Sequence, residues 1–187
     1  SVLGYKQDTP WTNEEVQSLY DANINEIRID EVGSVIDELD KNENLSYTIY
    51  QSSENDKVTG YAIPIAGKGL WGTMYGYFAI EPDAETVKGI TFYKHKETPG
   101  LGAEVDKDWF KNNFVGKKLT NKNGELVSIE VIKGYVSDTD PDAPHKVDGI
   151  SGATITGTGL TTFLKSDLQK YEPYFAKVRS VNQIESL

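Results

Sequence analysis

The sequence predicts an α+β domain: a mostly antiparallel sheet, flanked by an N-terminal helical region and a C-terminal helix. Four short runs rich in aromatic and β-branched residues follow one another between residues 47 and 93, separated by turn-forming residues. An apolar stripe with helical spacing appears near the end of the chain. Strands gathered in the middle and helices at the ends favour this class over alternating βαβ units.

The N-terminal region is predicted to be helical. From Trp11 to Leu39 the chain is polar with spaced apolar residues, so we expect one or two helices there, capped by Thr12 or Asn13. Gly33 is expected to break them, and residues 40–44 are typical of a turn. These features divide the chain into an N-terminal helical region, residues 1–44, and a main domain, residues 45–187.

The strands of the main domain are predicted from period and composition. Four successive strands at this spacing are typical of an antiparallel meander, and a fifth strand is expected further on. The expected strands are Tyr47–Tyr50, Val58–Ile65, Thr73–Ile80, Val87–Tyr93 and Val127–Ile132.

Two helices are expected after the meander. One covers Ala103–Phe110 and the other follows Ser151. The second is the stronger prediction because its apolar residues recur at intervals of three and four for more than three turns. These residues are Leu160, Phe163, Leu164, Leu168, Tyr171 and Phe175.

Charge and composition exclude several functions. The chain carries 19 basic and 29 acidic residues, a net charge of -10, which disfavours nucleic acid as a partner. It has no cysteine, which excludes disulfides, thiolate catalysis and iron–sulfur ligation. Asp138, Asp140 and Asp142 imitate the start of a calcium loop, but Ala143 and Gly149 replace the glycine and glutamate that such a loop needs. We therefore predict no metal site.

No catalytic group is predicted either. Gly67, Gly69 and Gly72 form the pattern G-x-G-x-x-G, but a strand follows where a dinucleotide site requires a helix. A glycine-rich loop between strands is the better interpretation. His95 and His145 lack a nucleophile in a G-x-S-x-G context.

One candidate site segment runs from His95 to Gly102. Pro99 and Gly100 suit the centre of a type II turn, and Gly102 allows close approach of the backbone to another group. The alternative is a plain turn that joins a strand to the next helix.

The other candidate segment surrounds Thr154 at the start of the strongest helix. Ser151 is suited to cap this helix, and the free N–H groups of a first turn attract a phosphate. Gly152 and Ala153 leave the Thr154 hydroxyl accessible to a modifying enzyme. The alternative is a capped helix with glycines for packing.

Together these segments resemble the FMN-binding domain of the NqrC subunit of the sodium-translocating NADH:quinone reductase, with the RnfG subunit of Rnf-type complexes as a relative. Ser151-Gly-Ala-Thr154, preceded by Asp148-Gly149, resembles the acceptor signature of bacterial flavin transferases. Glu97-Thr-Pro-Gly-Leu-Gly102 and Gly67-Lys-Gly-Leu-Trp71-Gly72 resemble two further motifs of the family. The resemblance extends from about Tyr47 to Leu164.

The resemblance implies an electron carrier that holds FMN through a phosphoester to Thr154, without catalytic turnover of its own. Asp148 would serve recognition by the flavin transferase, which uses FAD and magnesium. Glu97 would hold its loop in place, and other residues would bind the phosphate or flank the flavin. The implied cofactor-binding residues are Thr154, Ser151, Gly152, Ala153, Ile155, Thr156, Glu97, Thr98, Pro99, Gly100, Leu101, Gly102, Leu70 and Trp71.

The resemblance also implies partners and a location. These are the other subunits of a bacterial inner-membrane redox complex, a flavin transferase during maturation, and a transmembrane helix before Ser1 that anchors the domain on the outer, periplasmic face. Two alternatives share the chemistry: the RnfG subunit of an Rnf-type complex, and a flavin-binding sensory or regulatory module.

Overall fold

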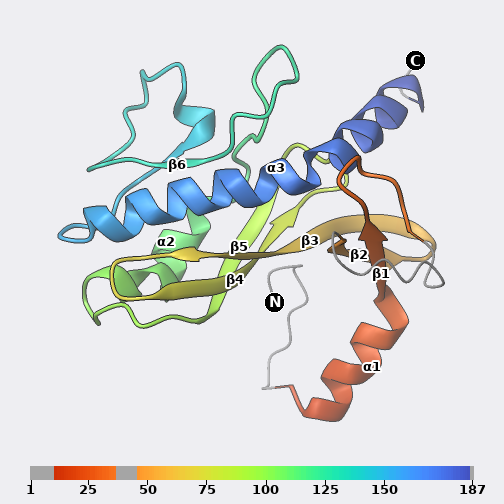
Figure 1. Cartoon of the computed structure of the whole chain (residues 1–187), viewed down its shortest axis with the longest axis horizontal. Coiled ribbons are helices and arrows are strands. Elements are labelled where there is room, and N and C mark those ends of the chain that lie inside the picture. The colour runs from red at the N-terminus through yellow and green to blue at the C-terminus, as the bar shows by residue number, and fades with distance from the viewer. Residues whose placement is uncertain (1–10, 37–45, 186–187) are drawn as a thin grey trace.

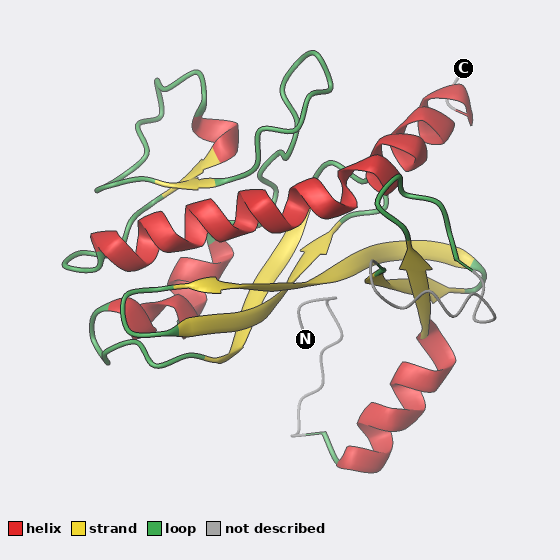
Figure 2. Cartoon of the chain, viewed as in Figure 1, coloured by secondary structure: helices red, strands yellow, loops and turns green. Residues whose placement is uncertain are grey.

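The computed structural model describes residues 11–36 and 46–185, and it confirms the α+β class. An antiparallel sheet of five strands has the order β1-β2-β3-β4-β5, and the long helix α3 runs across one of its faces (Figure 1). Among the described residues, the 3-10 helices η2 and η3 and long loops connect the remaining elements (Figure 2). The elements are α1 (Asn13–Asn23), β1 (Ile24–Ile29), β2 (Tyr47–Glu54), β3 (Lys57–Lys68), β4 (Thr73–Ile80), β5 (Val87–Lys94), η2 (Gly102–Asp106), α2 (Asp108–Asn112), β6 (Glu130–Val131), η3 (Ala143–His145), β7 (Lys146–Val147) and α3 (Thr154–Glu185).

The N-terminal region is helical only in part. Thr12 caps α1 as predicted, in a capping box with Glu15. The expected continuation of the helix was wrong, because Ile24–Ile29 forms strand β1 and pairs with β2 along its whole length. The spaced isoleucines of this strand fit a pleated surface, and the ladder satisfies its backbone groups. The turn predicted at residues 40–44 lies outside the described residues.

The meander is confirmed, but the segment after it is less regular than predicted. The expected strand Val127–Ile132 shortens to β6, which pairs in parallel with β7. Ser128 has a φ of 69°, which interrupts the extended backbone before β6. The expected helix Ala103–Phe110 divides into η2 and α2, because Lys107 between them is extended.

Helix α3 begins at Thr154, so the prediction that Ser151 caps it was wrong. Ala153 stands at the capping position and has no side-chain acceptor to offer. Ser151 lies in the exposed turn before the helix. The helix then runs for 32 residues, with Pro173 inside it.

The core lies between the sheet and α3. Apolar side chains of α3, such as Leu160 and Leu164, join side chains of β3 and β4 in one buried cluster. The last residue of β3 that pairs with β2 is Ala62. Beyond Ala62, α3 lies along the edge of β3 that β2 leaves unpaired. There buried Asp167 accepts a 2.8 Å hydrogen bond from the Ala66 N–H. No helix within the described residues combines the length and apolar character needed to cross a membrane.

Tyr61 is expected to make the fold sensitive to alkali. It is buried on β3 against Phe175, and burial raises the pKa of its phenol from 10.0 to about 12. The contribution of the Tyr61 phenol to the free energy of unfolding is therefore fully present below pH 10. It is lost between pH 10 and 12, by about 1.4 kcal/mol per pH unit. Tyr61→Phe should move the alkaline unfolding midpoint, followed by circular dichroism, to higher pH. Tyr135→Phe is the control, since Tyr135 is 86% exposed; equal midpoints in all three proteins would contradict the expectation.

Candidate functional site

Glu97 lies at the junction of three segments that are distant in the sequence. The residue is 6% exposed. Oε1 accepts a hydrogen bond of 2.9 Å from the N–H of Trp71, and Oε2 accepts one of 2.5 Å from the hydroxyl of Thr156. The β3–β4 loop, the segment after β5 and the first turn of α3 are thus joined through one side chain.

Two glycines make room for this carboxylate. A Cβ at Gly69 would lie 2.6 Å from Glu97 Oε1, and a Cβ at Gly102 would lie 2.4 Å from Oε2. The predicted need for close approach at Gly102 is confirmed, and its partner is the Glu97 side chain.

The segment between Glu97 and Gly102 is the predicted turn. The N–H of Leu101 donates to the carbonyl of Thr98 at 3.1 Å, and Gly100 has a φ of 73°. Thr98, Pro99 and Gly100 are exposed. The turn is also held at its start, because the Glu97 N–H donates to His95 Nδ1 and His95 Nε2 lies 2.7 Å from Asp106 Oδ2.

The start of α3 presents free backbone donors. Within the described residues, the N–H groups of Thr154, Ile155 and Thr156 have no hydrogen-bond acceptor, because intrahelical bonding begins with the Gly157 N–H. Thr154 and Ile155 are exposed, while the Thr156 side chain is buried towards Glu97. This arrangement suits an anion bound in front of the helix.

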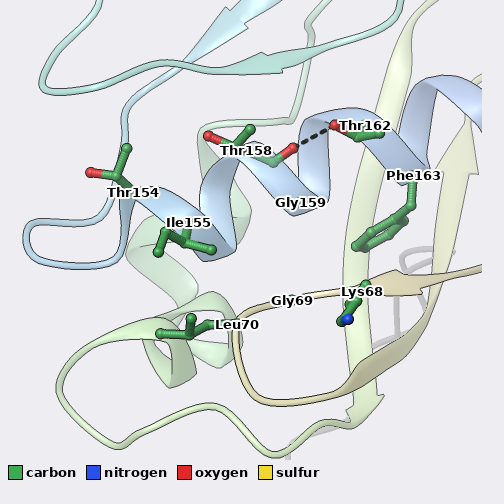
Figure 3. A pocket seen from close by; sticks show the side chains of 9 residues that line it. All are labelled: Lys68, Gly69, Leu70, Thr154, Ile155, Thr158, Gly159, Thr162 and Phe163. Atoms are coloured by element: carbon green, nitrogen blue, oxygen red, sulfur yellow. Dashed lines mark hydrogen bonds between the residues drawn. The ribbon is translucent and has the colours of Figure 1, made fainter.

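A hollow of about 510 Å³ lies beside Thr154, between α3 and the end of β3 (Figure 3). We call it the first hollow. Figure 3 shows Thr154 at the start of the helix, with Ile155 and Leu70 below it on opposite walls. Its lining is mostly apolar or hydroxyl-bearing: Lys68, Gly69, Leu70, Thr154, Ile155, Thr158, Gly159, Thr162 and Phe163.

A second hollow of about 450 Å³ lies beside the same helix start, and Thr154 and Thr158 line both. Its other walls are residues 130–135 and 149–153, together with Gly157. Asp148 supports these walls, since its Oδ1 accepts a 2.7 Å hydrogen bond from the Val136 N–H. The Asp148 carboxylate therefore has a structural contact within this chain.

The structure brings most of the predicted site residues together. Leu70, Thr154 and Ile155 line the first hollow, and Ser151, Gly152 and Ala153 line the second. Trp71 lines neither hollow, although it follows Leu70 and is 63% exposed. Leu101 lies beside Gly152, where an added Cβ would meet its side chain at 2.8 Å.

Sequence reasoning missed several lining residues. Thr158 and Thr162 follow Thr154 at intervals of four, a spacing that places them on one helix face and could have identified them. The apolar stripe predicts only a core position for Phe163, which also lines the first hollow. The sequence gives no sign that residues 130–135 belong to the site, because the β6–β7 pairing brings them to the helix start from a distant part of the chain.

Comparison with known proteins connects this geometry to a family. The profile described as the FMN-binding domain matches residues 69–169, a range that includes the Glu97 junction, the start of α3 and every lining residue of the first hollow except Lys68. The chain belongs to the FMN-binding domain family. FMN is the cofactor that such a domain accommodates.

Curated relatives are similar over most of the chain. The NqrC subunit of the Na(+)-translocating NADH-quinone reductase of Pseudomonas aeruginosa is 40% identical over 134 residues, which cover 71% of this chain and 51% of that protein. Its counterpart in Chlamydia muridarum is 44% identical over 132 residues, covering 63% of this chain and 42% of that protein. The chain thus spans about half the length of the curated relatives it matches.

Solved structures from the family share the fold. NqrC of Shewanella oneidensis superposes with a TM-score of 0.77 at 25% identity, covering 91% of this chain and 90% of that one. The corresponding subunit of the Parabacteroides distasonis Na(+)-translocating NADH-quinone reductase gives a TM-score of 0.75 at 31% identity, covering 90% of this chain and 86% of that one.

The donor set and the space of this FMN-binding domain fit FMN. The three unpartnered N–H groups at the start of α3, all within the described residues, suit a phosphate. The first hollow has the volume of a small-molecule site, and its Leu70 and Ile155 walls suit an aromatic ring system. Gly152 has a φ of 74°, so the turn before the helix needs a glycine there.

Proposed function

We propose that this chain is the FMN-carrying electron-transfer domain of an NqrC subunit of a sodium-translocating NADH:quinone reductase, with FMN joined by a phosphoester to Thr154 Oγ1. The observation that carries the proposal is the exposed Thr154 hydroxyl in front of three free N–H groups, between two hollows. The family match and the similarity to named NqrC proteins support it.

In this proposal Thr154 is a tether and the first turn of α3 is the phosphate site. The N–H groups of Thr154, Ile155 and Thr156 hold the phosphate, and the exposed position of Thr154 lets a flavin transferase reach the hydroxyl. Bond formation replaces the hydroxyl proton of Thr154 with the FMN phosphate supplied by FAD, and AMP leaves with the proton. Asp148 helps the transferase by holding the preceding turn in place through its bond to Val136.

The remaining site residues orient the ring and exclude water from it. Leu70 and Ile155 flank the ring in the first hollow, and exposed Trp71 and Leu101 lie outside its lining, Trp71 next to Leu70 in the chain and Leu101 beside Gly152. Glu97 keeps the Trp71 loop at a constant distance from the tether. When bound, FMN supplies one- and two-electron chemistry, which suits a relay between neighbouring redox centres.

The proposed setting is a bacterial inner-membrane complex, with this domain on the periplasmic face and the other subunits as partners. The named relatives favour an NqrC role over an RnfG role in an Rnf-type complex and over a sensory module, because the curated relatives reported above, at 40% and 44% identity, belong to the Na(+)-translocating NADH-quinone reductase.

Thr154→Ala is expected to abolish covalent loading. The unmodified chain, produced together with a flavin transferase, should gain the mass of one FMN less one water, while the Thr154→Ala protein should stay at the mass of its polypeptide. Mass spectrometry of the denatured protein measures both. Covalent FMN on Thr154→Ala would overturn the tether.

Thr158→Ala is the matched control for this experiment. Thr158 lies one turn further along the same helix face and also lines both hollows, so it shares the environment of Thr154 but not its place in front of the free N–H groups. We expect this variant to load FMN covalently. Loss of loading in both variants would mean that the region as a whole, and not the Thr154 hydroxyl, decides attachment.

A further inference from the structure

The sheet face opposite α3 carries a row of tyrosines. Rings from β2, β4 and β5 contact one another in sequence: Tyr50–Tyr77 at 5.9 Å, Tyr77–Tyr93 at 5.6 Å and Tyr75–Tyr93 at 6.3 Å between centroids. We call Tyr50, Tyr75, Tyr77 and Tyr93 the tyrosine face. Tyrosine is enriched in protein–protein interfaces, because it offers a large apolar ring with a polar end.

Strand β3 crosses this row without interrupting it. Its residues on the same face are Ala62, Pro64 and Ala66, which pair with Tyr50, Tyr77 and Tyr75. Because these side chains are short, rings from β2 and β4 meet across the strand. The result is a broad surface of rings instead of separate side chains.

The helices that build the core lie on the other side of the sheet. Phe110 and Phe114, in and just after α2, share one buried cluster with Leu160 of α3. Among the described residues, α1 does reach the tyrosine face, where Tyr20 contacts Tyr50 at one end of the row. At the other end Tyr93 is 63% exposed, a large value for an aromatic residue on a sheet.

Three lysines border that exposed end. The Lys94 Nζ lies 5.5 Å from the centroid of the Tyr75 ring. Lys68 is the last residue of β3, and the Lys96 side chain lies beside Gly72 in the β3–β4 loop. We call Lys68, Lys94 and Lys96 the lysine edge. None of the three forms an ion pair with a described carboxylate, a property they share with other described lysines such as Lys57 and Lys122.

The lysine edge adjoins the first hollow. Lys68, Gly69 and Leu70 are consecutive, and all three line that hollow. Figure 3 shows the Lys68 side chain pointing away from α3. A protein bound to this surface would therefore lie next to the cofactor site.

The charge distribution favours one kind of partner. The chain as a whole has a net charge of -10, so it repels an acidic protein in most orientations. The lysine edge is a local exception, and an acidic partner is attracted there. Repulsion elsewhere and attraction at one edge select a single docking orientation.

We propose that the tyrosine face and the lysine edge form the docking surface for an acidic redox partner protein, with the tyrosines in the contact core and the lysines at its rim. The proposal rests on the electron-transfer role proposed above. It assigns the partner's approach to the sheet side of the cofactor site, beside the β3–β4 loop.

Lysine acetylation of the assembled complex tests this surface. The membrane complex that contains this chain and the isolated 187-residue chain are treated with acetic anhydride at low salt, and mass spectrometry gives the labelling rate of each lysine. We expect Lys68, Lys94 and Lys96 to react roughly tenfold more slowly in the complex than in the isolated chain, a ratio that salt should reduce. Lys57, at the start of β3, and Lys122, in a turn, lie away from the lysine edge and should react equally in both.

Charge reversal supplies the second arm. In a complex that carries Lys68→Glu and Lys94→Glu, Lys96 should lose its protection. Lys57→Glu with Lys122→Glu is the matched control and should leave Lys96 protected. If the chain purifies with the complex but its lysine edge labels as fast as in isolation, the docking surface is wrong and the proposed function stands. If the chain enters no membrane redox complex, both proposals fail.

Discussion

Glu97→Ala is expected to lower the free energy of unfolding by about 2 to 5 kcal/mol, because one buried donor and one partly buried donor lose their acceptor at once. The Trp71 N–H and the Thr156 hydroxyl both donate to the carboxylate of Glu97, a residue that is 6% exposed. Urea denaturation of the chain without FMN measures the change. The same variant should load FMN more slowly when the transferase is present, because the Trp71 loop and the first turn of α3 are no longer held together.

Glu97→Gln separates hydrogen bonding from charge. The amide oxygen can still accept from the Trp71 N–H, and the amide nitrogen can donate to the Thr156 hydroxyl. We therefore expect stability and loading close to those of the unmodified chain. If the Gln variant loses as much as the Ala variant, the negative charge and not the hydrogen-bond geometry carries the effect, and Glu97 is more than a connection between segments.

Gly159→Ala is the second large effect. Alanine in a helix interior usually gains up to about 1 kcal/mol over glycine. Here the added Cβ would lie 2.3 Å from the Lys68 carbonyl oxygen, a backbone atom that can move only if β3 separates from α3. We expect a net loss of about 2 to 3 kcal/mol of stability, typical of overpacking, together with a widened first hollow.

Gly157→Ala is the comparison for this substitution. Its Cβ would lie 3.1 Å from Val131 Cγ1, a side-chain atom that can adjust by rotation. The helix-forming gain should then offset the contact, and thermal unfolding should place this variant within about 1 kcal/mol of the unmodified chain. If both variants unfold alike, the close approach of α3 to the end of β3 does not limit stability.

The sequence predicted the meander and the C-terminal helix because their signals are local. Strand period, turn residues and the Leu160–Phe175 stripe all lie within each element. The polar, spaced pattern of residues 24–29 suits a helix as well as a strand, so the sequence predicts a helix where the structure has β1. Only its pairing with β2, a contact between distant segments, decides the outcome. Tertiary contacts override a weak local preference there.

In the candidate site too, local motifs could be predicted from the sequence and contacts between distant segments could not. The importance of Thr154, Glu97 and Gly102 could be inferred from motifs and from their resemblance to a family. The position of the Thr156 hydroxyl could not, since it depends on the Glu97 side chain 59 residues earlier in the chain. Residues 130–135 of the second hollow likewise come to the site through a two-residue parallel ladder, which is too short to leave a periodic pattern.

The way α3 covers the end of β3 also bears on solubility during folding. Beyond Ala62 this strand has no β2 partner among the described residues, and an uncovered strand edge recruits strands from other molecules. Asp167 occupies the Ala66 N–H, and a Cβ at Gly67 would lie 2.0 Å from Phe163 Cβ, so the helix is seated directly on the strand. Until α3 is synthesised and docked, the nascent sheet is open to intermolecular pairing. The helix that presents Thr154 thus also shields the domain from self-association.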